Sequence, residues 1–330
     1  MKIIAVIVTA LLAASSAHAE TTELRVAKQY GLGYLQMMLM EDQHLIEKEA
    51  AKAGLGDLKV TWATFRSSDV MNDALISGSV DLVALGPAGL ATIWAKTRGN
   101  IDVRGVSAMN AQPNFLNTRK PEIASIRDFT DKDRIALPAV KVAMQALALE
   151  MAAAQAFGPG NYAKLDSLTV SMAHPDGMTA LLSGAGEITA HYTSAPYQYL
   201  ELKRPGIHKV LDSYEAMGGP YTFNVISTTA KFRTANPKVY AAFLAALRAA
   251  TDQINRDKPA AAAAYLRIAN DKSPLADFVA MMNDPQIEFT LVPKRLMAVA
   301  EFMHQVGTIK VRPGSWKDLF FDEAQSLPGS

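Results

Sequence analysis

The chain contains no cysteine among its 330 residues. This absence excludes a disulfide framework, thiol catalysis and thiolate metal sites. It also excludes the cysteine that tethers an exported lipoprotein to a membrane. A surplus of either charge is missing too, because 33 lysines and arginines stand against 32 aspartates and glutamates. A nearly neutral chain gives no reason to expect nucleic acid or another polyanion as a partner.

Motifs of common catalytic sites are also absent. The sequence has no G-x-S-x-G elbow, H-E-x-x-H pair, phosphate-binding loop or G-x-G-x-x-G turn. Methionine clusters at 37–40 and 281–282 fit helix cores better than a metal site. We therefore expect no catalytic residue, no metal and no cofactor, and predict that the protein is not an enzyme. Beyond the N-terminus the histidines lack the spacing of metal ligands: His44, His174, His191, His208 and His304.

Long uncharged apolar runs occur only at the N-terminus. Lys2 precedes an apolar stretch at 3–14, and Ala17-His18-Ala19 forms a small-x-small site before Glu20. This order is typical of a secretory signal peptide. The apolar stretch is too short to cross a membrane, which takes about 20 residues. We expect cleavage after Ala19 and a mature protein that diffuses freely in the periplasm, as a monomer.

The rest of the chain is long and apolar enough for two cores, with 49% hydrophobic residues overall. Segments with strand character alternate with helical ones, the first of which spans 34–52. This alternation predicts βαβ units and mostly parallel sheets. Stretches near 110–128 and 217–220 interrupt the alternation. We therefore expect an α/β fold with lobe one at residues 20–110 plus 218–330 and lobe two at 111–217.

One unit of sequence occurs twice, about a hundred residues apart. The segment 74–84 reads ALISGSVDLVA, and the segment 180–190 reads ALLSGAGEITA. Each copy contains a helix end, a Ser-Gly stop, an acidic residue and a strand. A proline that opens a helix follows each copy, at Pro87 and Pro196. The repeat predicts two similar lobes.

These features together resemble the periplasmic substrate-binding proteins of ABC importers in the nitrate, sulfonate, taurine and thiamine-pyrimidine-precursor group. The similarity covers essentially the whole mature chain. It implies a type II periplasmic-binding-protein fold with two hinge crossings, closure of the hinge on a solute, and docking to a permease with a separate ATPase. The motifs that carry the similarity lie, in order, at residues 74–88, 123–129, 180–196, 236–243 and 258–262.

The predicted site lies where the two lobes face each other. In open parallel sheets, ligands bind beyond the carboxyl ends of the strands, where helix amino ends offer free N–H groups. By this argument the candidate ligand-binding residues are Tyr30, Arg66, Ser67, Gly86, Pro87, Val140, His191, Tyr192, Thr193 and Tyr221. The resemblance implies the same role for Tyr30, Ser67, Gly86, Pro87, Val140 and His191.

Some of these residues also have a purely structural interpretation. Tyr30 is either a stacking wall or a surface aromatic, and Ser67 caps a helix in any case. Arg66 either contacts a solute or pairs with a carboxylate. His191 ends a buried strand, so it is either a ligand contact or a hydrogen-bonded core histidine.

The candidate loops are more aromatic than an inorganic anion requires. We therefore expect a small organic solute with a ring or with a carboxylate or sulfonate end. Two alternatives stay open at this point: a sensing partner of a membrane kinase or secondary transporter, and an enzyme of pyrimidine-precursor synthesis.

Overall fold

The computed structural model describes residues 19–330. The predicted signal peptide therefore lies outside the described residues, apart from Ala19. Within the described part, no helix is long and apolar enough to cross a membrane.

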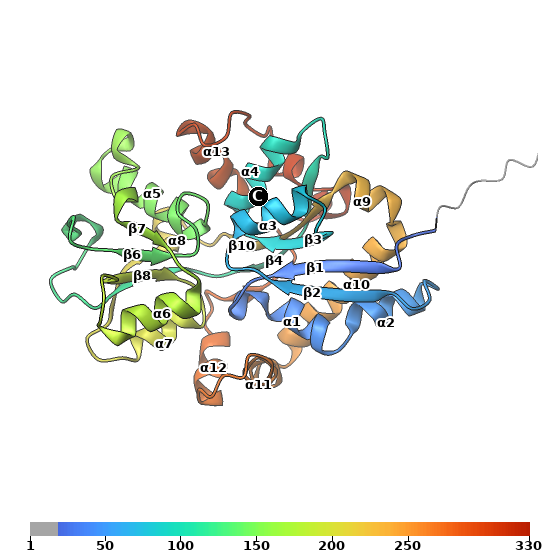
Figure 1. The fold of residues 1–330 in the computed structure, drawn as a ribbon, viewed down its shortest axis with the longest axis horizontal. Coiled ribbons are helices and arrows are strands. Elements are labelled where there is room, and N and C mark those ends of the chain that lie inside the picture. The colour runs from blue at the N-terminus through green and yellow to red at the C-terminus, as the bar shows by residue number, and fades with distance from the viewer. Residues whose placement is uncertain (1–18) are drawn as a thin grey trace, which may run out of the picture.

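The described chain folds into two β-sheets that lie side by side, each flanked by helices (Figure 1). The first sheet has the order β11-β4-β10-β3-β1-β2, and the second has the order β7-β6-β8-β5-β9. We call the part around the first sheet lobe one and the part around the second sheet lobe two. The chain passes to lobe two between β4 and β5 and returns between β9 and β10. The predicted α/β class with two crossings is confirmed.

Both termini of the described chain belong to lobe one. Its elements before the first crossing are β1 (Glu23–Lys28), α1 (Leu35–Asp42), α2 (Leu45–Lys52), β2 (Lys59–Thr64), α3 (Ser68–Ile76), β3 (Leu82–Leu85), α4 (Pro87–Thr97) and β4 (Val103–Ala111). Those after the second crossing are β10 (Thr222–Thr229), α9 (Ala230–Ala235), α10 (Pro237–Arg256), α11 (Lys258–Ile268), α12 (Leu275–Met282), β11 (Glu288–Phe289), α13 (Leu296–Gln305) and α14 (Asp322–Gln325).

Lobe two occupies the middle of the sequence. Its elements are β5 (Phe115–Thr118), β6 (Ile135–Leu137), α5 (Met144–Phe157), β7 (Thr169–Ser171), α6 (His174–Ser183), β8 (Ala190–Thr193), α7 (Tyr197–Leu202), β9 (His208–Asp212) and α8 (Ser213–Met217). The predicted lobe boundaries at 110/111 and 217/218 fall in or beside the two crossings.

Strand β3 shows why the central strands consist of consecutive apolar residues. Leu82 and Ala84 pack into the core on one face of the first sheet, and Val83 and Leu85 pack into the core on the other. A strand that is buried on both faces has no solvent side, so it carries no alternating polar residues.

The strands run mostly in one direction, as expected, but each sheet contains an inserted antiparallel strand. In lobe one β10 lies antiparallel between β3 and β4. In lobe two β5 lies antiparallel between β8 and β9. Both inserted strands come from the other lobe: no helix lies between β4 and β5, and only the short helix α8 lies between β9 and β10. Neither strand is therefore reached by the crossover within one sheet that makes successive strands parallel. Strand β5 lies within the segment that interrupted the predicted alternation.

The single helix predicted at 34–52 is wrong. The chain forms α1 and α2, separated at Gln43 and His44. His44 has a φ of 52°, in the left-handed region, which a continuing helix does not allow. The pattern of apolar residues continues from one helix into the next, so the sequence gave no sign of the break.

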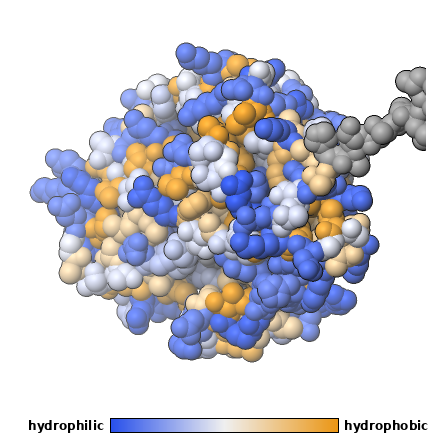
Figure 2. Space-filling model, turned by 45° about the vertical axis from the view of Figure 1, so that its right-hand side comes forward, coloured by the Kyte–Doolittle hydropathy of each residue, from blue (hydrophilic) through white to orange (hydrophobic). Residues whose placement is uncertain are grey.

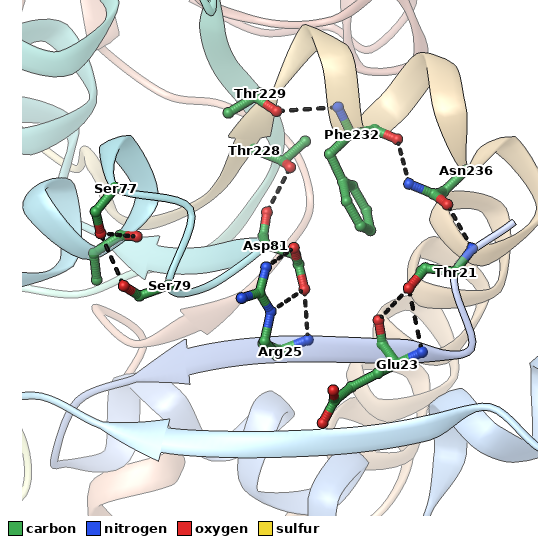
Figure 3. Close-up of polar contacts among 11 residues, drawn as sticks. Thr21, Glu23, Arg25, Ser77, Ser79, Asp81, Thr228, Thr229, Phe232 and Asn236 are labelled. Carbon is green, nitrogen blue, oxygen red and sulfur yellow. Dashed lines mark hydrogen bonds and ion pairs between the residues drawn. The ribbon is translucent and has the colours of Figure 1, made fainter.

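The acidic residue of the first repeat copy has a structural role. The carboxylate of Asp81 accepts hydrogen bonds from the backbone N–H of Arg25 at 2.8 Å and from its guanidinium at 2.7 and 3.0 Å (Figure 3). The carbonyl of Asp81 accepts from the Thr228 hydroxyl at 2.6 Å. Asp81 thus ties β1 and β10 to the start of β3.

The second repeat copy is held in a different way. Glu187, at the position of Asp81, is exposed. In this lobe the guanidinium of Arg119 donates to the carbonyls of Gly184, Gly186 and Ile188, at 2.6, 3.1 and 3.0 Å. The two units share a helix, a glycine with positive φ and a strand, but they differ in the side chain that fixes the turn.

Buried polar contacts tie the two crossings together. The Tyr221 hydroxyl lies 2.9 Å from Asn114 Oδ1 and 3.0 Å from Ser213 Oγ. The Asn114 N–H donates to Ser213 Oγ at 2.7 Å. We call Asn114, Ser213 and Tyr221 the crossing cluster. All three are inaccessible to solvent, so each lost contact would leave a buried polar group unpaired.

We predict that Asp81→Asn lowers the free energy of unfolding by roughly 2 kcal/mol, because charged hydrogen bonds to Arg25 are lost. Urea denaturation measures this. Glu187→Gln is the matched control, since it removes the same charge at the equivalent exposed position and should change stability by less than about 0.5 kcal/mol. Equal effects of the two variants would contradict the assignment.

Candidate functional site

A small cavity of about 20 Å³ lies between the two lobes, where their strands end. This volume holds about one water molecule. We call it the inner cavity. No carboxylate, lysine or arginine is among the described residues that line it. Lobe one contributes Gln29, Tyr34, Ser68, Gly86, Phe223 and Asn224, and lobe two contributes Pro138, Ala143, Met144, Gln145 and His174.

Four helix amino ends meet at the inner cavity. Ser68 and His174 are the first residues of α3 and α6, Gly86 precedes α4, and Met144 begins α5. None of these four ends has a hydrogen bond from a capping side chain. The first N–H groups of a helix have no partner within the helix and carry partial positive charge. The inner cavity is therefore a donor-rich environment without a fixed counter-charge, which favours an anionic group.

The side chain of Met144 closes the inner cavity from the lobe-two side. Its Sδ accepts a hydrogen bond from the backbone N–H of Ala88 at 3.3 Å. A Cβ on Gly86 would lie 2.6 Å from Met144 Cγ, so the close approach of the lobes requires glycine at this position. Met144 itself is almost fully buried.

A larger chamber of about 430 Å³ lies outside the inner cavity and shares Gln29 with it. We call it the outer chamber. Both lobes line it, and three of its walls are tyrosine rings. Its volume is in the range of pockets that hold small organic ligands. Its lining consists of Lys28, Gln29, Tyr30, Gly31, Met38, Thr64, Tyr265, Ile268, Ala269 and Asp271 from lobe one, and Pro175 and Tyr197 from lobe two.

Direct contacts hold the two lobes together around this cleft. The Leu32 N–H of lobe one donates to the Ala195 carbonyl of lobe two at 2.9 Å. The Tyr199 hydroxyl of α7 donates to Asp284 at 2.9 Å, beyond the end of α12. On the other side of the molecule, the rings of Tyr162 and Phe302 meet edge to face at 6.3 Å. The described conformation is therefore a closed one.

His174 is the titratable residue of the inner cavity. Its Nδ1 lies 2.7 Å from Thr193 Oγ1, and its ring stacks on Tyr197 at 5.6 Å. Burial lowers the pKa of His174 well below 6.5, and nearby His191, with its ring 5.7 Å away, lowers it further. His174 is therefore neutral at pH 7, and its second ring nitrogen, Nε2, lies 3.4 Å from Ser194 Oγ.

Two of the predicted site residues lie on the cleft. Tyr30 lines the outer chamber with 42% of its surface exposed, and Gly86 lines the inner cavity. Pro87 is the buried first residue of α4, next to Gly86.

Three other predicted residues lie beside the cleft without lining it in this conformation. Ser67 precedes α3 and hydrogen-bonds to the carboxylate of Asp69, while its neighbour Ser68 lines the cavity. Arg66 is exposed. Val140 packs against the lobe-two core, and its N–H donates to Ser171 Oγ at 3.0 Å.

The remaining four predicted residues are buried and do not line either cavity of the cleft. His191 Nδ1 lies 2.6 Å from Glu201 Oε1, and both side chains are fully buried. Thr193 contacts His174, as described above. Tyr192 points into the lobe-two core, and Tyr221 belongs to the crossing cluster.

Sequence reasoning missed most of the lobe-two lining. Val140 is the only residue of the segment before α5 that the sequence selected, whereas Met144 and Gln145, the first two residues of α5, line the inner cavity. His174 follows β7 and opens α6, so the same strand-end rule would have selected it. Tyr197 and Tyr265 lie too far apart in sequence for a local pattern to join them.

Metal binding has no support in the geometry. No group of three or more histidine, aspartate or glutamate side chains within residues 19–330 is arranged to hold a metal ion.

We predict that the free energy of unfolding falls as the pH drops below 6.5. The unfolded chain then protonates His174 while the folded protein does not, so stability declines by up to about 1.4 kcal/mol per pH unit. Urea denaturation between pH 5 and pH 8 measures this slope. In His174→Gln this contribution is absent, so the variant should lose less stability than the wild type over the same range. Parallel slopes would show that His174 titrates normally.

Comparison with known proteins places these features in a family. The NMT1-like family matches residues 17–269, well over half of the chain. A search of curated proteins finds no match.

Solved structures share the fold at low sequence identity. The alkanesulfonate-binding protein SsuA from Xanthomonas axonopodis pv. citri, bound to MOPS, has a TM-score of 0.70 and 16% identity over 93% of this chain and 98% of that chain. The periplasmic aliphatic sulphonate binding protein SsuA from Escherichia coli has a TM-score of 0.64 and 18% identity over 91% and 99%.

A Candida albicans gene product with the generic periplasmic binding protein fold has a TM-score of 0.64 and 12% identity, over 88% of this chain and 92% of that chain. These likenesses establish the periplasmic binding protein fold. With the match over residues 17–269, they lead to one conclusion: the chain belongs to the NMT1-like family.

Proposed function

We propose that this protein is the periplasmic solute-binding component of an ABC importer and captures a small organic solute between its lobes. The observation that carries the proposal is the cleft itself, in which uncapped helix amino ends from both lobes meet at one cavity beside a chamber of ligand size. Similarity to the two SsuA proteins, described as sulfonate-binding, supports this role. In this role the protein is a monomer, and its partner is an inner-membrane permease with a separate ATPase.

The acidic end of the solute binds toward the inner cavity. Helix amino ends of α3, α4, α5 and α6 stabilise negative charge there, and no carboxylate of the lining opposes it. Gln29, Gln145 and Asn224 supply amide groups that orient the oxygen atoms of a carboxylate or sulfonate. His174 adds no charge to this site, since it is neutral and its ring nitrogens face the hydroxyl groups of Thr193 and Ser194.

The body of the solute occupies the outer chamber. Tyr30 and Tyr265 from lobe one and Tyr197 from lobe two present ring faces and edges to this space. Aromatic walls favour a planar or ring-bearing body. The Xanthomonas relative is described as an alkanesulfonate-binding protein bound to MOPS.

Solute entry requires the lobes to separate. The inner cavity is closed to the size of one water molecule, so a solute reaches the helix amino ends only when the hinge opens. Rotation at the two crossings is the simplest motion, because these are the connections between the sheets. Closure then removes the solute from water and strengthens each polar contact.

We predict that one class of organic anion raises the melting temperature of residues 20–330. Solute at about 100 times its dissociation constant adds about 2.7 kcal/mol, which corresponds to at least about 2 °C. The thermal-shift panel contains nitrate, alkyl and aryl sulfonates, aromatic carboxylates, pyrimidines and amino acids. A flat panel with folded protein would contradict solute binding of these classes and favour the sensing alternative.

We predict that Tyr30→Ala weakens binding of a ring-bearing solute about three- to tenfold, the range expected for loss of one aromatic contact. Titration calorimetry measures the change. Tyr30→Phe keeps the ring and should retain most of the affinity, and a ring-free solute with the same acidic end should be unaffected. If alanine and phenylalanine weaken binding equally, the ring of Tyr30 does not contact the solute.

A further inference from the structure

The first backbone N–H group of helix α4 faces lobe two and donates a hydrogen bond to a methionine sulfur. The helix begins at Pro87, which has no N–H, so Ala88 provides the first donor. Met144 Sδ lies 3.3 Å from this nitrogen. Thioether sulfur is a weak acceptor, whereas an oxyanion at a helix amino end is a strong one. The group that now satisfies Ala88 is therefore the weaker of the two possible partners.

Met144 also takes up the space that an oxyanion needs. The inner cavity measures about 20 Å³ with the side chain in place. Met144 Cγ approaches the Gly86 position so closely that a Cβ there would lie 2.6 Å away. Methionine has three rotatable side-chain bonds and changes rotamer readily.

A second residue points to a ligand at the same place. Gln145 is 98% buried and lines the inner cavity, and its side-chain amide has no hydrogen-bond partner among residues 19–330. Its amide atoms are not among the fully buried unpaired atoms, so they keep access to the inner cavity, where a bound group or a water can pair with them. The free amide of Gln145 and the weakly bound N–H of Ala88 therefore border the same cavity from opposite lobes.

We propose that Met144 is a specificity-determining gate of the inner cavity. In the closed conformation its thioether occupies the place that the acidic end of the solute takes. Binding of a carboxylate or sulfonate then requires the side chain to leave the Ala88 N–H. This inference rests on the proposed function, because it concerns the same cleft. It implies that the gate lowers the affinity for small anions and admits solutes whose bodies make further contacts in the outer chamber.

Titration calorimetry with methanesulfonate and acetate tests the gate. Met144→Ala should bind at least one of these anions about tenfold more tightly than the wild type, since no side chain has to be displaced. Met151→Ala is the matched control. Met151 lies two turns further along α5 and packs on the same apolar cluster between the lobes, but it does not line the inner cavity. The control should bind like the wild type.

Unchanged or weaker binding by Met144→Ala, with Met151→Ala like the wild type, would overturn the proposal. Met144 would then only pack between the lobes. If Met144→Ala does not fold, Met144→Leu replaces it, because leucine keeps the apolar contacts and removes the acceptor. We expect leucine to tighten anion binding about threefold, and an unchanged affinity would equally overturn the gate.

Amide hydrogen exchange in the solute-free protein separates this proposal from the proposed function. The Ala88 amide should exchange about tenfold faster in Met144→Ala than in the wild type or in Met151→Ala. If no anion binds to any variant, the proposed solute class fails. The exchange result alone then decides whether Met144 covers the Ala88 N–H. Equal exchange in all three proteins would show that Met144 does not occupy the Ala88 N–H in solution, and the gate would fail as well.

Discussion

The arrangement of the two lobes depends on the buried polar contacts where the chain crosses between them. Asn114, Ser213 and Tyr221 are inaccessible to solvent, and their hydrogen bonds join one crossing to the other. Because buried polar groups must be paired, these bonds hold the crossings in a fixed relation. The same crossings deliver β5 and β10 into the middle of the sheets, so the sheets, the hinge and the cleft share this one constraint.

The cleft follows from where the fold places helix amino ends. Strand ends of both sheets point toward the gap between the lobes, and the following helices begin there without side-chain caps. Backbone donors left free in this way need a partner. In the closed conformation Met144 supplies one for Ala88, while the Gln145 amide has none among the described residues. The crossing cluster differs in that its hydroxyl groups and Asn114 Oδ1 pair with one another, although Asn114 Nδ2 has no partner among the described residues.

The outer surface differs from the cleft in composition. Hydrophilic residues cover most of the face seen in Figure 2, with hydrophobic residues in small separate groups. The aromatic rings of the outer chamber lie instead in the cleft between the lobes, except for Tyr30 at its mouth. The tyrosine rings of the outer chamber therefore offer a solute apolar contacts within the cleft.

The sequence alone determined the α/β class, the two crossings and the family, because these depend on local periodicity and on motifs a few residues long. It also selected Tyr30 and Gly86, which the structure places on the cleft, because both lie just beyond the end of a strand. It missed the division of residues 34–52, where one left-handed residue interrupts an apolar pattern that continues on both sides. Only the tertiary structure decided which residues share the cleft: Met144 contacts Ala88 across the gap, Tyr197 and Tyr265 line the same chamber, and His191 pairs with the buried Glu201. Such contacts join residues distant in sequence, and packing of the lobes sets them rather than any local preference.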